Sequence, residues 1–546
     1  MVKSSRSGWL MGAMTYSIIM TAIFVAGMAT ATSQLIWLST PFTEFAVNSD
    51  TLYPALLAEE IRSDLSALTL FRPSRIPSYL PDLFIFVLLD LAVGNWRIAW
   101  WMYGAIAICL MATLGGCIAS LALGQKTMPT IAVFATLTCI ALLAGAAHYE
   151  TFANQQQLNM FAARLPVNIH LMLMMPVFQS GAFMAGLAVI LLAWQTANSR
   201  KLAMGAGLAV LTTLSVASNL IVVAHAVLPA ILGLILAVRR YHLRADGRHL
   251  ALFALATGAM CGAGLGNIAG REELPIITTS DFGANAWHAV SELPNQPTVL
   301  LAILASLPMA VAYLRMSEVE RRFALQMPGA IRFFLTVSCA AVCAGVLLVL
   351  PQYYIPLSWR YAAPLAWWPM IWAAGLLVTW FAGRLGRSTV TISAGLAVMV
   401  GVATISGPRP ALLSWVPSLA TCLDELDPEV RLDAGLADYW NARLLSAASN
   451  WRRQISQLNG DGSAALYINN PREFFQRRHA PAGTAPLFRF VVMQRMDDSR
   501  IRAAYGPPDR DHLCGQEILW IFNKPIDVNA ILAVSPDLVD WRYRRN

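Results

Sequence analysis

The sequence predicts an all-α polytopic membrane protein with a small α/β or α+β domain at its C-terminal end. Hydrophobic residues make up 57% of the 546 residues and charged residues only 13%, whereas soluble domains carry roughly 25% charged residues. Several apolar runs reach the ~20 residues that a helix needs to cross a bilayer. From residue 406 onward these runs give way to short segments and turns typical of a soluble domain.

About eleven apolar segments are long enough to be spans, and interfacial helices are expected in the loop after the first one. That first segment is too long for a removable signal peptide and lacks a small-residue cleavage site, so we expect a retained anchor. The predicted spans are 13–36, 99–123, 128–147, 171–194, 202–218, 220–238, 249–267, 296–314, 331–350, 364–382 and 389–405.

Lysine and arginine in the short loops orient these spans. Lys3, Lys126, Arg239 and Arg240 fall in loops that alternate with less basic ones, and the positive-inside rule places such basic loops in the cytoplasm. The net charge of +8 is then a property of these loops and not a sign of nucleic-acid binding. An odd number of spans puts the C-terminal residues on the outer, periplasmic side.

One further apolar run, residues 79–94, carries Asp82 and Asp90 and is at the short limit for a span. We therefore expect it to lie in the interface or to dip into the membrane. The predicted organisation is a transmembrane domain over residues 1–405, with a first outer loop at 37–98, followed by a soluble domain at 406–546.

In the C-terminal region, residues 435–458 read as an amphipathic helix, and the segments 464–469, 487–494, 517–522 and 530–535 read as strands. Cys422 and Cys514 are the two cysteines that lie outside apolar runs. On an oxidising outer face we expect them to form a disulfide. The sequence has no CxxC motif and no Cys/His cluster with metal-ligand spacing, so we predict no zinc site and name no metal ligands.

The stretch "NSDTLYPALLAEEIRSDL" places Asp50, Glu59 and Glu60 just beyond the first span. Asp50 has two interpretations. It is a helix-capping residue type ahead of a helix that Pro54 begins. It is also a carboxylate at a membrane surface, where it can accept the proton of a substrate hydroxyl as a general base. Glu59 and Glu60 are candidates for similar work, although such residues on an exposed helix are commonly only solvated.

The order of these features resembles the GT-C glycosyltransferase superfamily, which includes the protein O-mannosyltransferases and the lipid A aminoarabinose transferases. "SWRYAAPLAWWP" is similar to the Arg-Tyr and Pro that open a late span there, and "PVNIHLMLMMPVF" is similar to a segment with an outer-loop histidine. The resemblance implies a polyprenyl-phosphate sugar donor, a bacterial inner-membrane location and an acidic base early in the first outer loop. Asp50 is the matching position, Arg360 and Tyr361 match the late motif, and His170 matches the histidine.

An inverting transfer needs one base for the acceptor and cations for the departing phosphate. Guanidinium groups suit phosphate, but near a membrane the same arginines also neutralise lipid head groups. A histidine beside a span is more often a satisfied interfacial residue than a functional one. The candidate contacts for phosphate, sugar or acceptor are Arg72, Arg75, Arg271, Arg360, Tyr361, His148, His170, Glu59, Asp281 and His288.

The sequence thus predicts a membrane glycosyltransferase with Asp50 as base. Its partners would be a polyprenyl-phosphate sugar, a periplasmic glycan or glycolipid acceptor and membrane lipids, without nucleic acid. No cofactor is identified, and a divalent cation is left open, although nothing in the sequence indicates one. An O-antigen polymerase or ligase is the first alternative. A transporter is the second, although charges are almost absent from the predicted spans and no internal repeat is seen.

Overall fold

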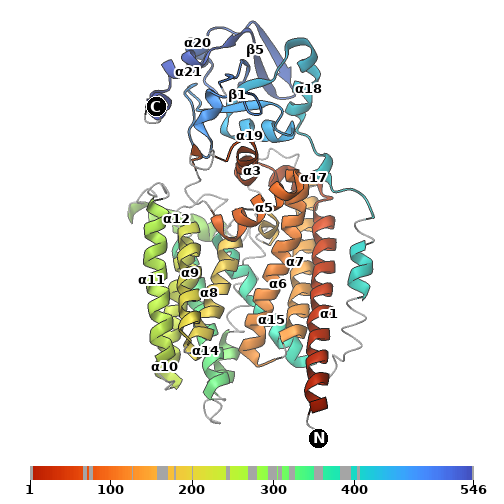
Figure 1. Cartoon of the computed structure of the whole chain (residues 1–546), viewed down its shortest axis with the longest axis vertical. Coiled ribbons are helices and arrows are strands. Elements are labelled where there is room, and N and C mark those ends of the chain that lie inside the picture. Colours follow the sequence, from red (N-terminus) through yellow and green to blue (C-terminus); the bar gives the residue numbers. More distant parts are fainter. Residues whose placement is uncertain are drawn as a thin grey trace. The chain divides into compact units, whose positions relative to one another are not determined.

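The computed structural model (Figure 1) forms two compact units. The helical unit comprises Met1–Phe42, Ile76–Ile85 and Trp100–Ala411, and the mixed unit comprises Thr43–Arg75, Phe86–Ala99 and Leu412–Asn546. The structure describes residues 4–65, 70–72, 78–125, 127–155, 170–176, 180–199, 201–241, 246–268, 279–292, 300, 304, 310–318, 326–349, 361–381, 395–402, 406–481 and 483–543.

The units do not divide the chain at the single boundary that the sequence predicted near residue 406. Two pieces of the expected outer loop 37–98 pack with the C-terminal residues in the mixed unit. Helix α3 (Tyr53–Ser63) in this loop carries buried carboxylates whose partners lie more than 400 residues later in the chain.

The protein is a mostly helical, multi-pass membrane protein, with seven helices long and apolar enough to cross a bilayer among the described residues. These candidate spans are Thr15–Ile36, Trp96–Leu123, Thr127–Ala147, Ser180–Ser199, Val223–Tyr241, Gly247–Asn267 and Gly329–Leu347. The helices of this unit are α1 (Ser4–Ile36), α6 (Trp96–Leu123), α7 (Thr127–Gln155), α8 (Ser180–Ser199), α9 (Leu202–Ser218), α10 (Leu228–Tyr241), α11 (Asp246–Ile268), α12 (Thr279–Glu292), α14 (Gln326–Val349) and α15 (Ala363–Phe381).

Seven of the predicted spans correspond to these seven helices. The segment predicted at 202–218 is the 17-residue apolar helix α9, and the segment predicted at 364–382 is helix α15. The predicted spans at 296–314 and 389–405 fall largely outside the described residues. The predicted span at 171–194 begins later than expected, because residues 171–174 form a short 3-10 turn and α8 starts at Ser180. Pro176 between them lacks the amide hydrogen that a continuous helix would use.

Glycines set the close approach of α9 and α11, which lie side by side in Figure 1. A Cβ atom added at Gly258 would lie 2.8 Å from the carbonyl oxygen of Ala209, and one at Gly262 would lie 2.5 Å from that of Thr213. The two glycines are four residues apart on one face of α11. Small residues at this spacing let two apolar helices pack backbone to backbone, which is how helices associate inside a bilayer.

The run predicted to be interfacial is helical. It consists of the π-helical turn η1 (Tyr79–Leu83) and helix α5 (Phe84–Val93). Its two carboxylates are both buried, each within a different unit. In the helical unit the hydroxyl of Tyr103 donates a 2.7 Å hydrogen bond to Asp82, while in the mixed unit Asp90 lies 3.3 Å from a guanidinium nitrogen of Arg62. A short apolar run can carry two acids because each has a partner.

The mixed unit is built on a five-stranded sheet with the strand order β2-β1-β3-β5-β4. Its strands are β1 (Ala434–Asp438), β2 (Gln454–Leu458), β3 (Phe488–Val492), β4 (Arg510–Cys514) and β5 (Glu517–Ile526). β1 runs parallel to β2 and β3, while β5 runs antiparallel to β3 and β4. The helices from the C-terminal part of the chain are α17 (Ala411–Ser414), α18 (Ser418–Val430), α19 (Tyr439–Ala448), η7 (Pro471–Phe474), α20 (Asp498–Tyr505), α21 (Val528–Ala533) and α22 (Pro536–Tyr543).

Hydrophobic side chains cover both faces of this sheet. One core joins α18 and α19 to alternate strand residues such as Phe490 and Ile521. The other joins α20, α21 and α22 to the intervening residues such as Val491 and Trp520. Successive strand residues point to opposite faces, so the sheet is the middle layer of three. This is a small α/β domain, one of the two forms that the sequence predicted.

Several predicted elements of this domain are corrected. Residues 435–458 are not one helix but the unit β1-α19-β2, and residues 530–535 belong to the end of helix α21 and the turn after it, not to a strand. Residues 464–469 make only one isolated bridge, between Leu458 and Ala464. The predicted strands at 487–494 and 517–522 are present as β3 and β5.

Candidate functional site

Asp50 lies in a tight loop between α2 (Thr40–Ala46) and α3 (Tyr53–Ser63). Asn48 and Thr51 shape this loop. Asn48 Oδ1 accepts hydrogen bonds from the backbone nitrogens of Asp50 and Thr51, at 3.0 and 3.3 Å, and Thr51 Oγ1 donates to the carbonyl of Ala46 at 2.6 Å. The N-cap of α3 is Leu52, without a side-chain capping bond. Capping is therefore not what Asp50 does, and its side chain is available for another role.

The carboxylate of Asp50 is half-buried and accepts a hydrogen bond from the hydroxyl of Tyr439 at Oδ1. Tyr439 is the first residue of α19, which Asp438 caps by accepting from the backbone nitrogens of Trp440 and Asn441. Burial raises the pKa of Tyr439 far above its usual range. The phenol consequently keeps its proton and acts as the donor of this hydrogen bond.

The loop before Asp50 is fixed to the start of α19 by two further contacts. Ser49 Oγ donates to the carbonyl of Tyr439 at 2.6 Å. Arg443 donates to the carbonyl of Ser49 and to that of Ile468, the latter at 2.6 Å, and its guanidinium lies 5.1 Å from the ring centre of Tyr439. Since Arg443 is buried and Ser49 is fully buried, the backbone beside Asp50 is held by groups that water does not reach.

Glu59 and Glu60 are buried, not solvated, and face the segment from Asn470 to His479. Glu59 pairs with Arg62 and lies 2.6 Å from His479 Nε2. Glu60 accepts from Asn470 Nδ2 at 2.8 Å and from Arg478 Nε at 3.0 Å. These partners account for both carboxylates, so their observed role is to hold α3 against the C-terminal residues. The substrate contact expected for Glu59 would have to displace one of these pairs.

A small polar pocket of about 100 Å³ adjoins these ion pairs. Three arginines and three carboxylates of α3 and the C-terminal region contribute to it. Its lining residues are Glu60, Ser63, Asp64, Gln454, Arg472, Glu473, Gln476, Arg477, Arg478, His479 and Ala480.

Two carboxyl groups in this unit have pKa values near neutrality. Burial raises the pKa of Glu473 to about 7, an effect that Arg478 partly offsets and Glu60 adds to. Burial also raises the pKa of Asp90 to about 6, although Arg62 acts in the opposite direction. Both groups therefore change their protonation within the physiological pH range.

The other predicted site residues are dispersed. In the mixed unit, Arg72 is exposed and its backbone nitrogen donates to Asn469 at 2.9 Å. In the helical unit, His170 is buried edge-on against Trp367, with ring centres 4.9 Å apart, and burial lowers its pKa to about 4. Tyr361 is buried just before α15, and His288 is exposed on α12.

The remaining predicted residues lie outside what the structure describes. His148 and Asp281 belong to helices α7 and α12, but their side chains are not among those described. Arg75, Arg271 and Arg360 lie outside the described residues altogether. Of the four arginines expected to hold phosphate, Arg72 alone can therefore be placed.

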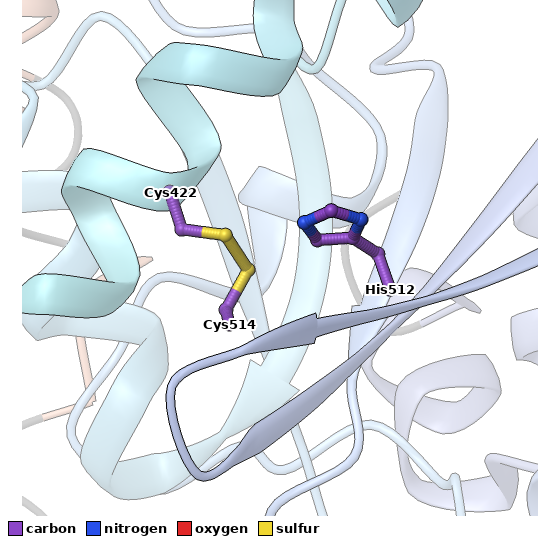
Figure 2. Close-up of side chains that lie close together, drawn as sticks. All are labelled: Cys422, His512 and Cys514. Carbon is purple, nitrogen blue, oxygen red and sulfur yellow. A yellow bond between two sulfur atoms is a disulfide. The ribbon is translucent and has the colours of Figure 1, made fainter.

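Cys422 in α18 and Cys514 at the end of β4 form a disulfide with a Cα–Cα distance of 5.8 Å (Figure 2). The ring of His512 lies beside it, and the three potential ligand atoms are within 4.8 Å of one another. Metal ions bind the thiolate form of cysteine, which neither sulfur has while the two are bonded together. The pairing predicted from the sequence is thus the one present, and this group of ligands does not make a metal centre in that state.

Sequence reasoning did not identify Tyr439 as the partner of Asp50 or the segment 470–479 as the partner of α3. The sequence contains weak indications of these contacts. "DYWNAR" (Asp438 to Arg443) and "YINNPREFF" (Tyr467 to Phe475) stand out as polar clusters. In the structure Asp438 and Asn470 cap α19 and η7, while Tyr439, Arg443 and Asn470 also contact the loop around Asp50 and α3.

Comparison with known proteins finds no matching family model and no matching curated protein.

Proposed function

We propose that this protein is an inverting glycosyltransferase that moves a sugar from a polyprenyl-phosphate donor to a glycan or lipid-linked acceptor. Asp50 is its general base. We assign it to the bacterial inner membrane, with the mixed unit in the periplasm, following the distribution of basic loops. The observation that carries the proposal is the half-buried carboxylate of Asp50, which the hydroxyl of Tyr439 holds in the first polar loop after α1.

A general base needs a fixed carboxylate that remains ionised and has an accessible oxygen. The contact from Tyr439 engages Oδ1, and no described side chain donates to Oδ2. In the proposed step, Asp50 Oδ2 takes the proton of the acceptor hydroxyl while the hydroxyl oxygen of the acceptor forms a bond to the anomeric carbon of the sugar. The bond between this carbon and the phosphate oxygen breaks, and the polyprenyl phosphate leaves with the electron pair.

The leaving phosphate calls for cations, because charge on it grows as the bond breaks. Arg72 is the exposed candidate in the same unit as Asp50. From the sequence, we include Arg75, Arg271 and Arg360 as further candidates to bind this phosphate. His170 and Tyr361, which are buried in the helical unit, are assigned to supporting the fold of α15 and its neighbours and not to the proton transfer.

The test measures transfer of radiolabelled sugar from polyprenyl-phosphate donors to extracted envelope glycan by purified full-length protein. Asp50→Asn should lower the rate by about 10²- to 10⁴-fold, the usual contribution of a general base. Tyr439→Phe should lower kcat by roughly tenfold and leave the KM for the donor unchanged, since the phenol positions the base without touching the donor. Asp511→Asn, which neutralises an exposed carboxylate on β4, is the matched control.

If Asp50→Asn transfers sugar at the wild-type rate, Asp50 is not the general base. A Tyr439→Phe variant that loses donor affinity but keeps kcat would show that the phenol contacts the donor instead of positioning the base. Absence of transfer by the wild-type protein from every donor would favour the polymerase, ligase or transporter alternatives.

A further inference from the structure

The polar pocket beside α3 contains an arginine, Arg478, whose hydrogen-bonding capacity is only partly used. The side chain of Arg478 is only 6% exposed. Its Nε donates to Glu60 at 3.0 Å, and its Nη2 lies 3.9 Å from Glu473. Its Nη1 is buried and has no hydrogen-bond partner among the described residues. A buried donor in this position is costly unless something accepts its hydrogen bond.

The loop that carries Arg478 is held in place by side-chain hydrogen bonds. Gln454 Nε2 donates to the carbonyls of Glu473 and Gln476 at 2.6 and 3.0 Å. Gln454 Oε1 accepts from the backbone nitrogen of Arg478 at 2.6 Å, and Gln476 Oε1 accepts from that of Gly483 at the same distance. Two glutamine side chains therefore fix the loop that presents the arginines to the pocket.

The charges around the pocket favour an anion. The guanidinium groups of Arg472, Arg477 and Arg478 line the pocket together with the carboxylates of Glu60 and Asp64. Below neutral pH Glu473 is mostly protonated and adds little negative charge, because burial raises its pKa to about 7. At the mouth, Arg472 and Arg477 are 33% and 41% exposed, and their pairs with Asp64 and Asp433 are open to solvent. Such exposed pairs are weak and exchange partners easily.

The size of the pocket limits the ligand. Its volume of about 100 Å³ is well below the ~300–1,000 Å³ of sites that enclose a whole small molecule. It suits a single charged group, and guanidinium donors match the oxygens of phosphate and carboxylate.

We propose that this pocket binds a small oxyanion, a phosphate or carboxylate group, with Arg478 Nη1 as the buried donor and Arg472 and Arg477 at the mouth. The inference does not depend on the glycosyltransferase proposal, because Asp50 does not line the pocket and the test involves no sugar transfer.

The test is calorimetric titration of the purified full-length protein in detergent with inorganic phosphate, at constant ionic strength. Acetate is titrated separately to distinguish a carboxylate ligand from a phosphate ligand, and glucose serves as an uncharged probe. Saturable binding of phosphate or acetate, without binding of glucose, is the expected result. Arg477→Gln and Arg478→Gln should each weaken it by roughly tenfold or more.

Two further variants keep the outcome interpretable. Arg478→Lys retains the charge that Glu60 needs but loses the planar donor set, so it should fold normally and still bind less tightly. Arg510→Gln removes one cation from β4, outside the pocket, and should bind as the wild type does. No saturable binding, or equal affinity in wild type, Arg477→Gln and Arg478→Lys, would overturn the proposal.

A pH series with sulfate adds an independent readout, because sulfate keeps its charge between pH 6 and 8. The charged groups that face Glu473 are Arg478, Glu60 and Arg443, while His479 also lines the pocket. Loss of the Glu473 proton with rising pH should weaken sulfate binding. Glu473→Gln should remove most of that dependence, and an unchanged pH profile in this variant would exclude Glu473 from the pocket's electrostatics.

Discussion

The ion pair between Glu60 and Arg478 should be a main determinant of how firmly α3 is held in the mixed unit. Their side chains are 10% and 6% exposed, and the two interacting atoms are 3.0 Å apart. Removing one partner of a buried pair costs about 3–5 kcal/mol, because the other charge stays buried without compensation. We expect Glu60→Ala to destabilise this contact by about 3 kcal/mol, the lower end of that range. Glu473 still lies 3.9 Å from Arg478 Nη2 and partly compensates the unpaired charge.

The assay is hydrogen exchange of the backbone amides of α3 in the full-length protein, followed by mass spectrometry. A loss of about 3 kcal/mol corresponds to roughly 100-fold faster exchange, if the amides exchange through opening of this contact. Asp64→Ala is the matched control at the end of the same helix. Its pair with Arg472 is 39% and 33% exposed, so its loss should cost less than about 1 kcal/mol.

A second variant separates loss of attraction from burial of an unpaired charge. Glu60→Ala combined with Arg478→Met removes both charges and should recover much of the lost protection. Equal exchange rates in Glu60→Ala and Asp64→Ala would show that burial does not strengthen the Glu60 pair.

Three further predictions concern the mixed unit. Replacing Cys422 and Cys514 together with serine should destabilise it by about 4 kcal/mol, because their disulfide closes a loop with a sequence separation of 92; denaturant unfolding followed by tryptophan fluorescence measures this, and an unchanged midpoint would contradict it. Because the pKa of Glu473 is about 7 in the folded protein and 4.5 is its ordinary value, the folded state binds the extra proton, so the contribution of Glu473 to stability should be lost as pH rises from about 4.5 through 7. Comparing wild type with Glu473→Gln isolates this slope from that of Asp90, and parallel pH profiles would argue against it. Gly435→Ala should destabilise the sheet by about 1–3 kcal/mol, since its Cβ would lie 2.2 Å from the buried ring of Phe490; a thermal midpoint equal to wild type would show that the ring moves freely.

The sequence predicts those parts of the structure that depend on local hydrophobic pattern. Long apolar runs predict the candidate spans because a bilayer demands about 20 apolar residues whatever the tertiary structure. β3 and β5 are likewise recognisable from their β-branched and aromatic residues. β1 and β2 are not, because they are short parallel strands buried on both faces, and the helix between them has a pattern that extends easily over its neighbours.

The candidate site shows the limit of this reasoning. The position of Asp50 after the first span is a local property and can be read from the sequence. Its partner Tyr439 is 389 residues away, and the partners of Glu60 are 410 and 418 residues away. No periodicity links such segments, so two glutamates on a predicted surface helix look solvated until the fold brings arginines to them. Burial of Glu59 and Glu60 is a property of the tertiary structure alone.

We propose that Asp50 accepts the acceptor's proton during sugar transfer. The most direct test of this step is the single-turnover rate of transfer by wild type and Asp50→Asn, both loaded with the same radiolabelled polyprenyl-phosphate sugar and shown to bind it equally. We predict at least a 100-fold slower rate in Asp50→Asn, with an unchanged melting profile. Equal rates in the two proteins would exclude Asp50 as the general base.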